Sequence, residues 1–294
     1  MKIPKSLSII LTAISSPNNR WDELRYRWER MKRKFNKSHG LPATEDVGTI
    51  AKVLIDLRKM VEEKLGHNIT AAVTARPNLP GLTREDLEDA MEYAGMKMLR
   101  AYNYFSDVSE TSAASAATGK GLCKKPEDIK ACEDEEVTMP IYDILSVSFT
   151  NTILYLAYTR ISSANRCYEL VYTPHFNLGL QSLDIYPNAK AYWTEVNYAI
   201  RDFIDYPPRI DTVLLMGEAA PNEDFQKTLR DALKHFEPGL DVVMNISSSL
   251  EPLSLVARGA AELAKRFQVM TWNCKEPIRC REHRDTVGRP PIDL

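Results

Sequence analysis

The sequence predicts an α/β protein in which helices cover the faces of β-sheets. Short apolar segments typical of strands alternate with amphipathic segments of helical spacing along the chain. Helix N-cap residues stand immediately before two of the amphipathic segments. At 294 residues the chain is long enough to bury a large core, in one domain or in two lobes.

The first part of the chain is expected to be mainly helical. The apolar run SLSIILTAISS at 6–16, after the basic start at 1–5, predicts a buried first strand, with a weak secretory signal as the alternative. Residues 20–38 have the composition of an exposed helix. Thr44 is a suitable N-cap for a helix over residues 45–65, which Gly66 ends. Its inward face is expected to carry Val47, Ile50, Val53, Leu54, Leu57, Met60, Val61 and Leu65.

A second capped helix follows a predicted strand at residues 69–74. Thr83 with Asp86, three residues later, predicts a capping box. Four apolar residues of this helix are expected to face inward: Leu87, Ala90, Met91 and Ala94. The next expected elements are a strand at 98–102, an Ala- and Ser-rich helix at 110–117, and a polar loop or mobile insertion at 119–140.

The second half predicts paired strands followed by two further helix-containing units. Strands at 144–149 and 153–161 flank a turn at Thr150-Asn151-Thr152. The remaining expected elements are a strand at 168–172, a helix at 192–204, a buried strand at 213–216 that ends at Gly217, an amphipathic helix, and a small-residue helix after Pro252.

The charge balance of the whole chain gives no indication of a nucleic-acid or anionic-membrane partner. The chain has 38 basic and 40 acidic side chains and a formal net charge of −2. The basic run over residues 30–34 is interpreted as the solvated face of a helix. No apolar segment reaches the roughly 20 residues that span a bilayer. We therefore expect a cytoplasmic protein without a membrane span, with secretion as the alternative.

The cysteines and histidines do not form a recognisable metal motif. Five cysteines and five histidines are scattered, and none of their spacings is that of a zinc site, so no structural metal is expected. Cys123 with Cys132, and Cys274 with Cys280, would be suitable disulfide partners in an exported protein.

Four segments, in order, resemble the ATPase domain of the seventy-kilodalton heat-shock chaperones (DnaK-type), and more specifically divergent fungal proteins of that type. ITAAVTARPNLPGLTREDLEDAMEYAGMKML at 69–99 resembles the family's strand, proline loop and helix. SETSAASAATG at 109–119 resembles its hinge helix, and LGLQSLD at 178–184 its L-G-G-x-D-F-D motif. The segment from 210 to 265, with Gly217 and the helix after Pro252, resembles V-G-G-S-x-R-x-P followed by Y-G-A-A.

The resemblance covers residues 45–267 and implies a truncated actin-like fold of two lobes, with mixed sheets flanked by helices. Residues 1–118 would form the first lobe and 141–267 the second, separated by the loop or insertion at 119–140. Residues 268–294 would be a C-terminal tail.

The departures from the family pattern argue against ATP hydrolysis. The chain has no D-x-G-T hairpin, and its counterpart of D-x-G-G-G-T is Ser146-Val147-Ser148-Phe149-Thr150, which keeps only Thr150. Backbone approaches phosphate closely where glycine stands, and a carboxylate organises the metal's water shell. The second glycine of the adenosine turn is Glu218. Only 26 residues lie between Asp184 and Asp211, where the family places the subdomain that closes over adenine.

Two functions of different classes remain open. The first is a DnaK-like binding or regulatory module without a cofactor, whose partner is a protein or a small apolar ligand. In it Gly217, Thr150 and Gly179 are vestigial nucleotide-site positions. The second is a repurposed cyclase, isomerase or prenyl-diphosphate-type lyase that uses the cleft between the lobes. That alternative uses Glu218 and His175 as acid or base, and Asp86 and Asp89 as Mg²⁺ ligands.

Overall fold

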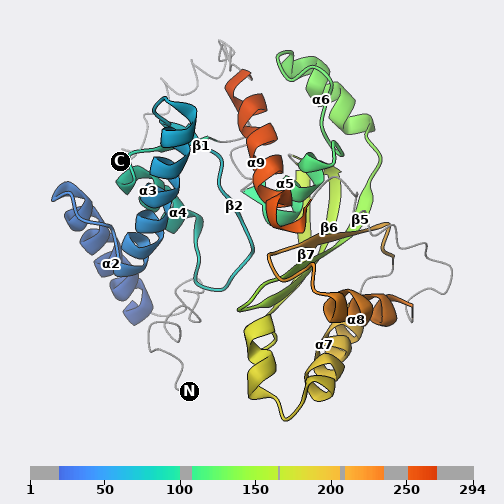
Figure 1. Cartoon of the computed structure of the whole chain (residues 1–294). Coiled ribbons are helices and arrows are strands. Elements are labelled where there is room, and N and C mark those ends of the chain that lie inside the picture. The colour runs from blue at the N-terminus through green and yellow to red at the C-terminus, as the bar shows by residue number, and fades with distance from the viewer. Residues whose placement is uncertain (1–19, 100–107, 165, 206–208, 235–250, 270–294) are drawn as a thin grey trace.

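A four-stranded sheet, in the order β7-β6-β5-β8, forms the centre of the second half of the chain (Figure 1). The computed structural model describes residues 20–99, 108–164, 166–205, 209–234 and 251–269. Strand pairs β5–β6 and β6–β7 are antiparallel, and β5–β8 is parallel. The strands are β5 (Tyr142–Phe149), β6 (Leu154–Ser163), β7 (Arg166–His175) and β8 (Thr212–Met216). All four strands predicted from residue 144 onward are therefore confirmed.

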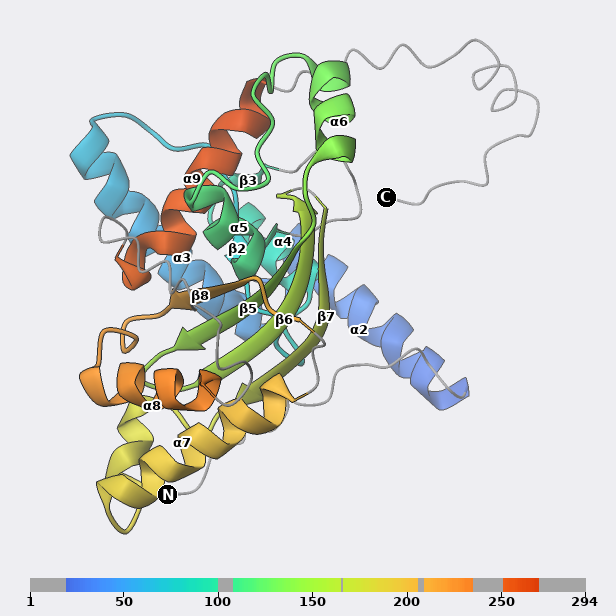
Figure 2. The ribbon, with the colours of Figure 1, turned by 90° about the vertical axis from the view of Figure 1, so that its right-hand side faces the viewer.

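Helices cover both faces of this sheet, as the α/β prediction requires (Figure 2). Alternate residues of β5 point to opposite faces because the side-chain period of a strand is two. Leu145 and Val147 share a core cluster with α7 (Ala189–Ile204) and α8 (Glu223–Leu233). Ile144, on the opposite face, packs in a cluster with residues of α5 (Glu110–Ala117) and α9 (Pro252–Val269).

Helices α5 and α9 cross at unusually close range because both carry small side chains at the contact. Ala113 and Ala114 of α5 are fully buried. Gly259 of α9 lies against the backbone of α5, and a Cβ atom at this position would overlap the Ala113 carbonyl. Close helix packing therefore requires glycine at position 259.

The N-terminal part of the described chain is a helical layer, which we define as α2 (Arg20–Ser38), α3 (Glu45–Leu65) and α4 (Arg84–Tyr93). Both predicted N-caps are present, since Thr44 accepts from the Val47 amide and Thr83 forms a capping box with Asp86. Gly66 ends α3 in the left-handed region at φ 71°.

The inward face predicted for α3 is correct only in part. Val47 is buried, and Ile50 and Leu54 pack beside it against Ala90 of α4. The other predicted positions are exposed, because α4 covers only a narrow strip of α3: Val53, Leu57, Met60, Val61 and Leu65. The prediction for α4 agrees better with the structure, because three of its four inward positions, Ala90, Met91 and Ala94, are buried.

Two pairs of very short parallel strands lie between the helical layer and the large sheet. β1 (Ala71–Ala72) pairs with β3 (Lys97–Met98), and β2 (Ala75–Arg76) pairs with β4 (Val108–Ser109). The strand predicted at 69–74 overlaps β1, whereas β2 begins at Ala75, immediately after the predicted range. The predicted strand at 98–102 overlaps β3 at Met98, and its residues after 99 lie outside the described part of the chain. The strand predicted within 6–16 also lies outside the described residues.

The predicted polar loop at 119–140 contains a helix, α6 (Ile129–Thr138). Asp128 is its N-cap and accepts a hydrogen bond of 3.0 Å from the Ala131 amide. A disulfide joins Cys123 to Cys132 in α6, which is one of the two pairings expected for an exported protein. In the part of the chain that the structure describes, no helix has the length and apolar content needed to cross a membrane.

Candidate functional site

Five of the seven predicted site residues lie at one end of the large sheet. Strands β5, β7 and β8 all end there, and β6 begins there. The chain beyond these strand ends supplies Thr150 after β5, Gly217 and Glu218 after β8, and Gly179 after β7, while His175 is the last residue of β7. The topology therefore assembles the vestigial nucleotide-site positions from distant parts of the sequence.

Both glycines at this end are in contact with the protein's own backbone. Gly217 has φ 99°, and a Cβ there would overlap the Phe149 carbonyl. A Cβ on Gly179 would overlap the backbone of Thr152 and of neighbouring residues in the β5–β6 turn. These glycines permit close approach of backbone to backbone, because the turn fills the space beside them.

The β5–β6 turn uses its polar groups within the chain. The Asn151 amide donates to a carboxylate oxygen of Glu218 at 2.8 Å. The carbonyls of Thr150 and Asn151 accept from the Leu180 and Gln181 amides, each at 3.0 Å. The Thr150 hydroxyl accepts from the Ile153 amide at 3.0 Å. Glu218 thus supplies, as part of the protein, an anionic acceptor of the kind that a phosphate would provide.

Two predicted acid–base residues have different surroundings. Glu218 is exposed, and its carboxylate accepts the hydrogen bond from the Asn151 amide. His175 is half-buried, and burial lowers the pKa of its imidazole, although the carboxylates of Asp202 and Glu195 act in the opposite direction. His175 is therefore a neutral imidazole at pH 7.

Asp86 and Asp89 lie on α4, in the helical layer, where they form an ion-pair cluster. Arg33 of α2 bonds Asp86 at 2.8 Å and Asp89 at 2.7 Å, and Lys37 bonds Asp89 at 2.6 Å. Burial acts to raise the pKa of Asp89, but hydrogen bonds from Lys37 and Arg33 outweigh burial and lower it. Two cations already neutralise these oxygens, so the arrangement does not fit Mg²⁺ and we derive no chemistry through that ion.

A second group of acids, not predicted from the sequence, lies where α5 meets β7. Glu110 is the first residue of α5 and Glu169 projects inward from β7. The Tyr155 hydroxyl of β6 lies 3.3 Å from Glu169 and accepts a 3.0 Å hydrogen bond from the Asn78 amide. Within the described residues, one carboxylate oxygen of Glu110 and one of Glu169 are buried without a hydrogen-bond partner.

These two carboxyl groups have raised affinity for protons. Burial, together with the charge of Glu169, raises the pKa of Glu110 to about 7. Burial also raises the pKa of Glu169, although hydrogen bonds from Tyr155 and Asn78 and the charge of Arg76 oppose it. A carboxyl group that titrates near neutral pH is suited to general acid or base chemistry. Such a group can equally be a structural element of the α5–β7 contact.

The pattern of β7 explains why the sequence did not reveal this group. Tyr168, Leu170 and Tyr172 have the apolar alternation of a buried face, but they are exposed on the edge strand. Glu169 occupies the opposite, inward face. The alternation of residues along β7 predicts that the strand has two different faces. It does not determine which of the two faces is directed inward.

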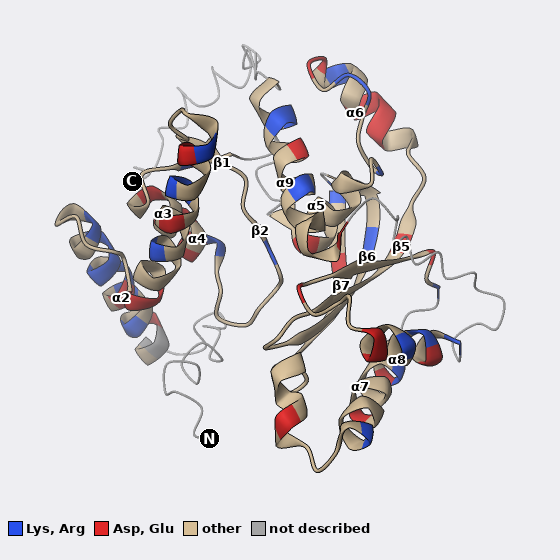
Figure 3. Cartoon of the chain, viewed as in Figure 1, with Lys and Arg blue, Asp and Glu red and all other residues tan. Residues whose placement is uncertain are grey.

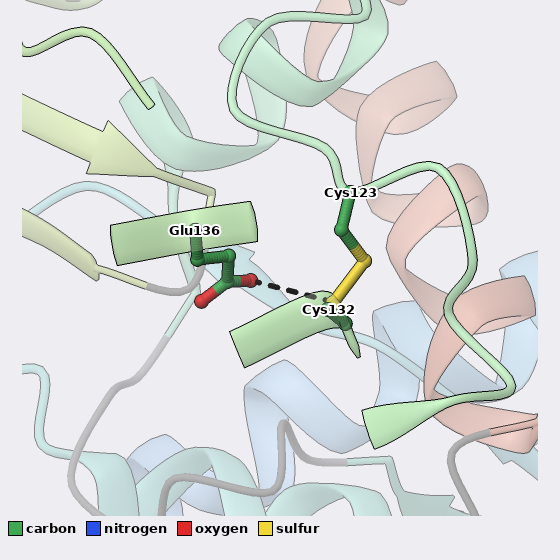
Figure 4. Close-up of side chains that lie close together, drawn as sticks. All are labelled: Cys123, Cys132 and Glu136. Carbon is green, nitrogen blue, oxygen red and sulfur yellow. Dashed lines mark hydrogen bonds between the residues drawn. A yellow bond between two sulfur atoms is a disulfide. The ribbon is translucent and has the colours of Figure 1, made fainter. Parts of the chain in front are cut away.

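A third group joins Cys123, Cys132 and Glu136 beneath α9 (Figure 4). The Cys132 sulfur lies 3.9 Å from a Glu136 carboxylate oxygen, and Arg166 lies 3.9 Å from the other oxygen. The two sulfurs form the disulfide, so they are not thiolate ligands for a metal. A neighbouring cavity of about 10 Å³ between this group and α9 has room for about one water molecule.

Comparison with known proteins adds no assignment to these sites. No family model matches the chain, and no curated protein matches it.

Proposed function

We propose that this chain is a degenerate DnaK-like domain that has lost ATP hydrolysis and acts as a binding or regulatory module. The observation that carries the proposal is the filled end of the sheet. The backbone at the end of β5 occupies the space beside Gly217, and the backbone of the β5–β6 turn occupies the space beside Gly179. Glu218 accepts a hydrogen bond from the Asn151 amide. An anionic nucleotide would have to displace a carboxylate and a packed turn.

A second observation favours a module over an enzyme. Large apolar side chains are exposed along one helix of the helical layer, for example Trp28 and Met31 on α2, which are 63% and 58% exposed. Clustered exposed apolar residues are typical of surfaces that contact a partner. They are not part of a concave site of the size that encloses a small substrate.

The proposal is tested by nucleotide binding and hydrolysis with the purified chain. Millimolar MgATP is expected to leave the melting temperature unchanged and to give no phosphate release above a protein-free blank. A ligand present at 100 times its Kd would stabilise the fold by about 2.7 kcal/mol, a shift of several degrees. A shift of that size, or steady phosphate release, would overturn the proposal.

A matched pair of variants sharpens this test. Glu218→Ala frees the Asn151 amide, whereas Glu223→Ala removes an acid from the start of α8 that has no role in the turn. We expect neither variant to bind MgATP, because the turn backbone still fills the site. Nucleotide binding gained only by Glu218→Ala would show that the Glu218 carboxylate, and not the packed turn, blocks the phosphate site.

The alternative function is a repurposed enzyme, a cyclase, isomerase or lyase, and one observation favours it. Glu110 and Glu169 are buried together, and the pKa of Glu110 is raised to about 7. Under this alternative Glu110, rather than Glu218 or His175, would be the acid–base group. Native mass spectrometry that finds a retained small molecule, lost in Glu110→Gln, would favour the enzyme over the module.

Cytoplasmic location also remains a proposal. The Cys123–Cys132 disulfide is typical of oxidising compartments and therefore supports the exported alternative. Trapping free thiols in the source cells before lysis, followed by mass spectrometry of the peptide containing both cysteines, distinguishes the two. Alkylated Cys123 and Cys132 would support the cytoplasm, and the linked peptide would support export.

A further inference from the structure

Helix α2 has its charged and apolar faces arranged in the reverse of the usual order. In a helix on a protein surface the apolar stripe normally faces the core and the charged residues face water. The charged face of α2 instead packs on α4, through Arg33 and Lys37 to Asp86 and Asp89, with Arg30 at 3.9 Å from Glu85. Salt bridges therefore attach α2 to α4.

The opposite face of α2 is an apolar stripe directed away from the protein. Its residues are spaced alternately three and four apart, so at 100° per residue they fall within an arc of about 80°. We call it the α2 stripe: Trp21, Leu24, Trp28, Met31 and Phe35. Each member is at least half exposed, and Trp21 is 79% exposed. The helix lies at the outer edge of the molecule in both views (Figures 1 and 2).

Basic residues border the α2 stripe along both sides. The residues that directly flank it are Arg25 and Lys32 on one side and Arg27 and Lys34 on the other. The helix carries eight basic and three acidic residues in all, and Figure 3 shows this concentration of Lys and Arg. The near-neutral charge of the whole chain hides this local excess, and the basic run at 30–34 by itself is interpreted as a solvated helix face.

A second copy of the chain is a poor occupant for this surface. The three–four spacing of the stripe is that of positions a and d of a coiled coil, in which Arg25, Lys32, Arg27 and Lys34 occupy the e and g positions. Paired helices would place these four basic residues opposite one another in either orientation. Like charges at these positions disfavour self-association.

Neither terminal segment of the chain supplies a complementary charge. Residues 1–19 contain no Asp or Glu, and residues 270–294 contain five basic and four acidic residues. An occupant that matches both the stripe and its borders is apolar and anionic. Because α4 already holds the inward face of α2, the occupant contacts one side of the helix. A flat surface meets this condition, whereas a groove encloses a helix.

We propose that α2 docks this protein onto an anionic lipid surface. The inference rests on the proposed binding module and names the class of its partner. The α2 stripe enters the boundary between headgroups and acyl chains, where tryptophan is favoured, and the bordering Lys and Arg residues contact anionic headgroups. The helix lies in the plane of the interface and does not span the bilayer.

The test is co-sedimentation of the full chain with vesicles of phosphatidylcholine alone or mixed with phosphatidylserine. Binding is expected only to the mixed vesicles, with a blue shift of tryptophan fluorescence, and is expected to weaken as salt screens the headgroups. Trp28→Ser with Met31→Ser should weaken binding by about tenfold or more. Lys32→Glu with Lys34→Glu should also weaken binding to the mixed vesicles by about tenfold or more, because both substitutions reverse a charge that contacts anionic headgroups.

A matched control uses exposed apolar residues outside the α2 stripe. Val53→Ser with Leu57→Ser removes two such residues from α3 and should leave vesicle binding unchanged. All these positions are exposed, so unchanged thermal melting curves will show that the variants are folded.

Four outcomes overturn the inference. They are no binding to mixed vesicles, equal binding to phosphatidylcholine alone, equal loss in the α3 control, and a dimer in solution that Trp28→Ser with Met31→Ser dissociates. Competition by an acidic polypeptide at a lower concentration than the vesicles would assign the α2 stripe to an acidic protein instead. Failure here, together with no MgATP binding, removes only the lipid partner and leaves the proposed module in place.

Discussion

The large sheet with its helices and the helical layer place their apolar residues in opposite ways. Around the sheet, Phe149 and Phe225 are fully buried and their rings stack with centroids 3.9 Å apart. In the helical layer, Trp28 and Met31 face outward, while Asp89 is only 7% exposed and is held by Arg33 and Lys37. The first region has the interior of an ordinary domain. The second buries charge and presents apolar surface, an arrangement that contributes little to stability and is consistent with the proposed contact with a partner.

The largest effect is expected from Gly259→Ala, which disturbs the covered face of the sheet. Replacing a solvent-exposed glycine inside a helix by alanine usually stabilises a protein by about 1 kcal/mol. Here the added methyl group overlaps the Ala113 carbonyl, so we expect destabilisation by about 3 kcal/mol or more. Thermal and urea unfolding measure the change. Ala257→Leu, at an exposed position of α9, is the control and should change stability little.

An intermediate effect is expected at the junction of α5 and β7. The pKa of Glu110 is about 7 in the folded protein and lower in the unfolded chain. The folded state therefore binds more protons between pH 4.5 and 7, and stability falls as the pH rises through that window. Glu110→Gln should flatten this fall and increase stability at pH 8 by about 2 kcal/mol. If the dependence of stability on pH were the same in Glu110→Gln, the fall in stability could not be assigned to Glu110.

The smallest effect is expected in the helical layer and should be local. Arg33→Ala leaves Asp86 and Asp89 with fewer partners and should increase hydrogen exchange in α2 by an amount equivalent to about 1–2 kcal/mol. Strands β5–β8 should exchange as before. Arg27→Ala, which breaks an exposed pair with Glu23, is the control and should have almost no effect.

The attachment of α2 should also respond to pH in the sense opposite to the α5–β7 junction. The folded-state pKa of Asp89 is lowered, so its stabilisation is complete above the unfolded value of about 3.9. It is lost as the pH falls through the lower folded value. Hydrogen exchange in α2 that increases on acidification below pH 4, before the sheet is affected, would support this comparison.

Much of the fold followed from local sequence signals, and the failures have a common physical cause. The caps at Thr44 and Thr83 and the strands around the Thr150 turn act over a few residues, and each was predicted. The exposed side of α3 and the inward Glu169 depend on which face a neighbouring element covers, and periodicity alone does not determine this. The resemblance indicated the residues at the sheet end, whereas the ion pairs of Asp86 and Asp89 required knowledge that α2 lies beside α4.

The crossing of α5 and α9 has a consequence for how the chain reaches its folded state. Ala113 meets Gly259 only after about 150 further residues have been synthesised. Until then the alanine face of α5 and the adjoining side of β5 have no cover, so a nascent chain on the ribosome carries an incomplete core. We expect folding of this region to be slow, since contacts between such distant residues carry a large loop-closure entropy. Truncation before residue 252 should therefore yield aggregates rather than a smaller folded protein.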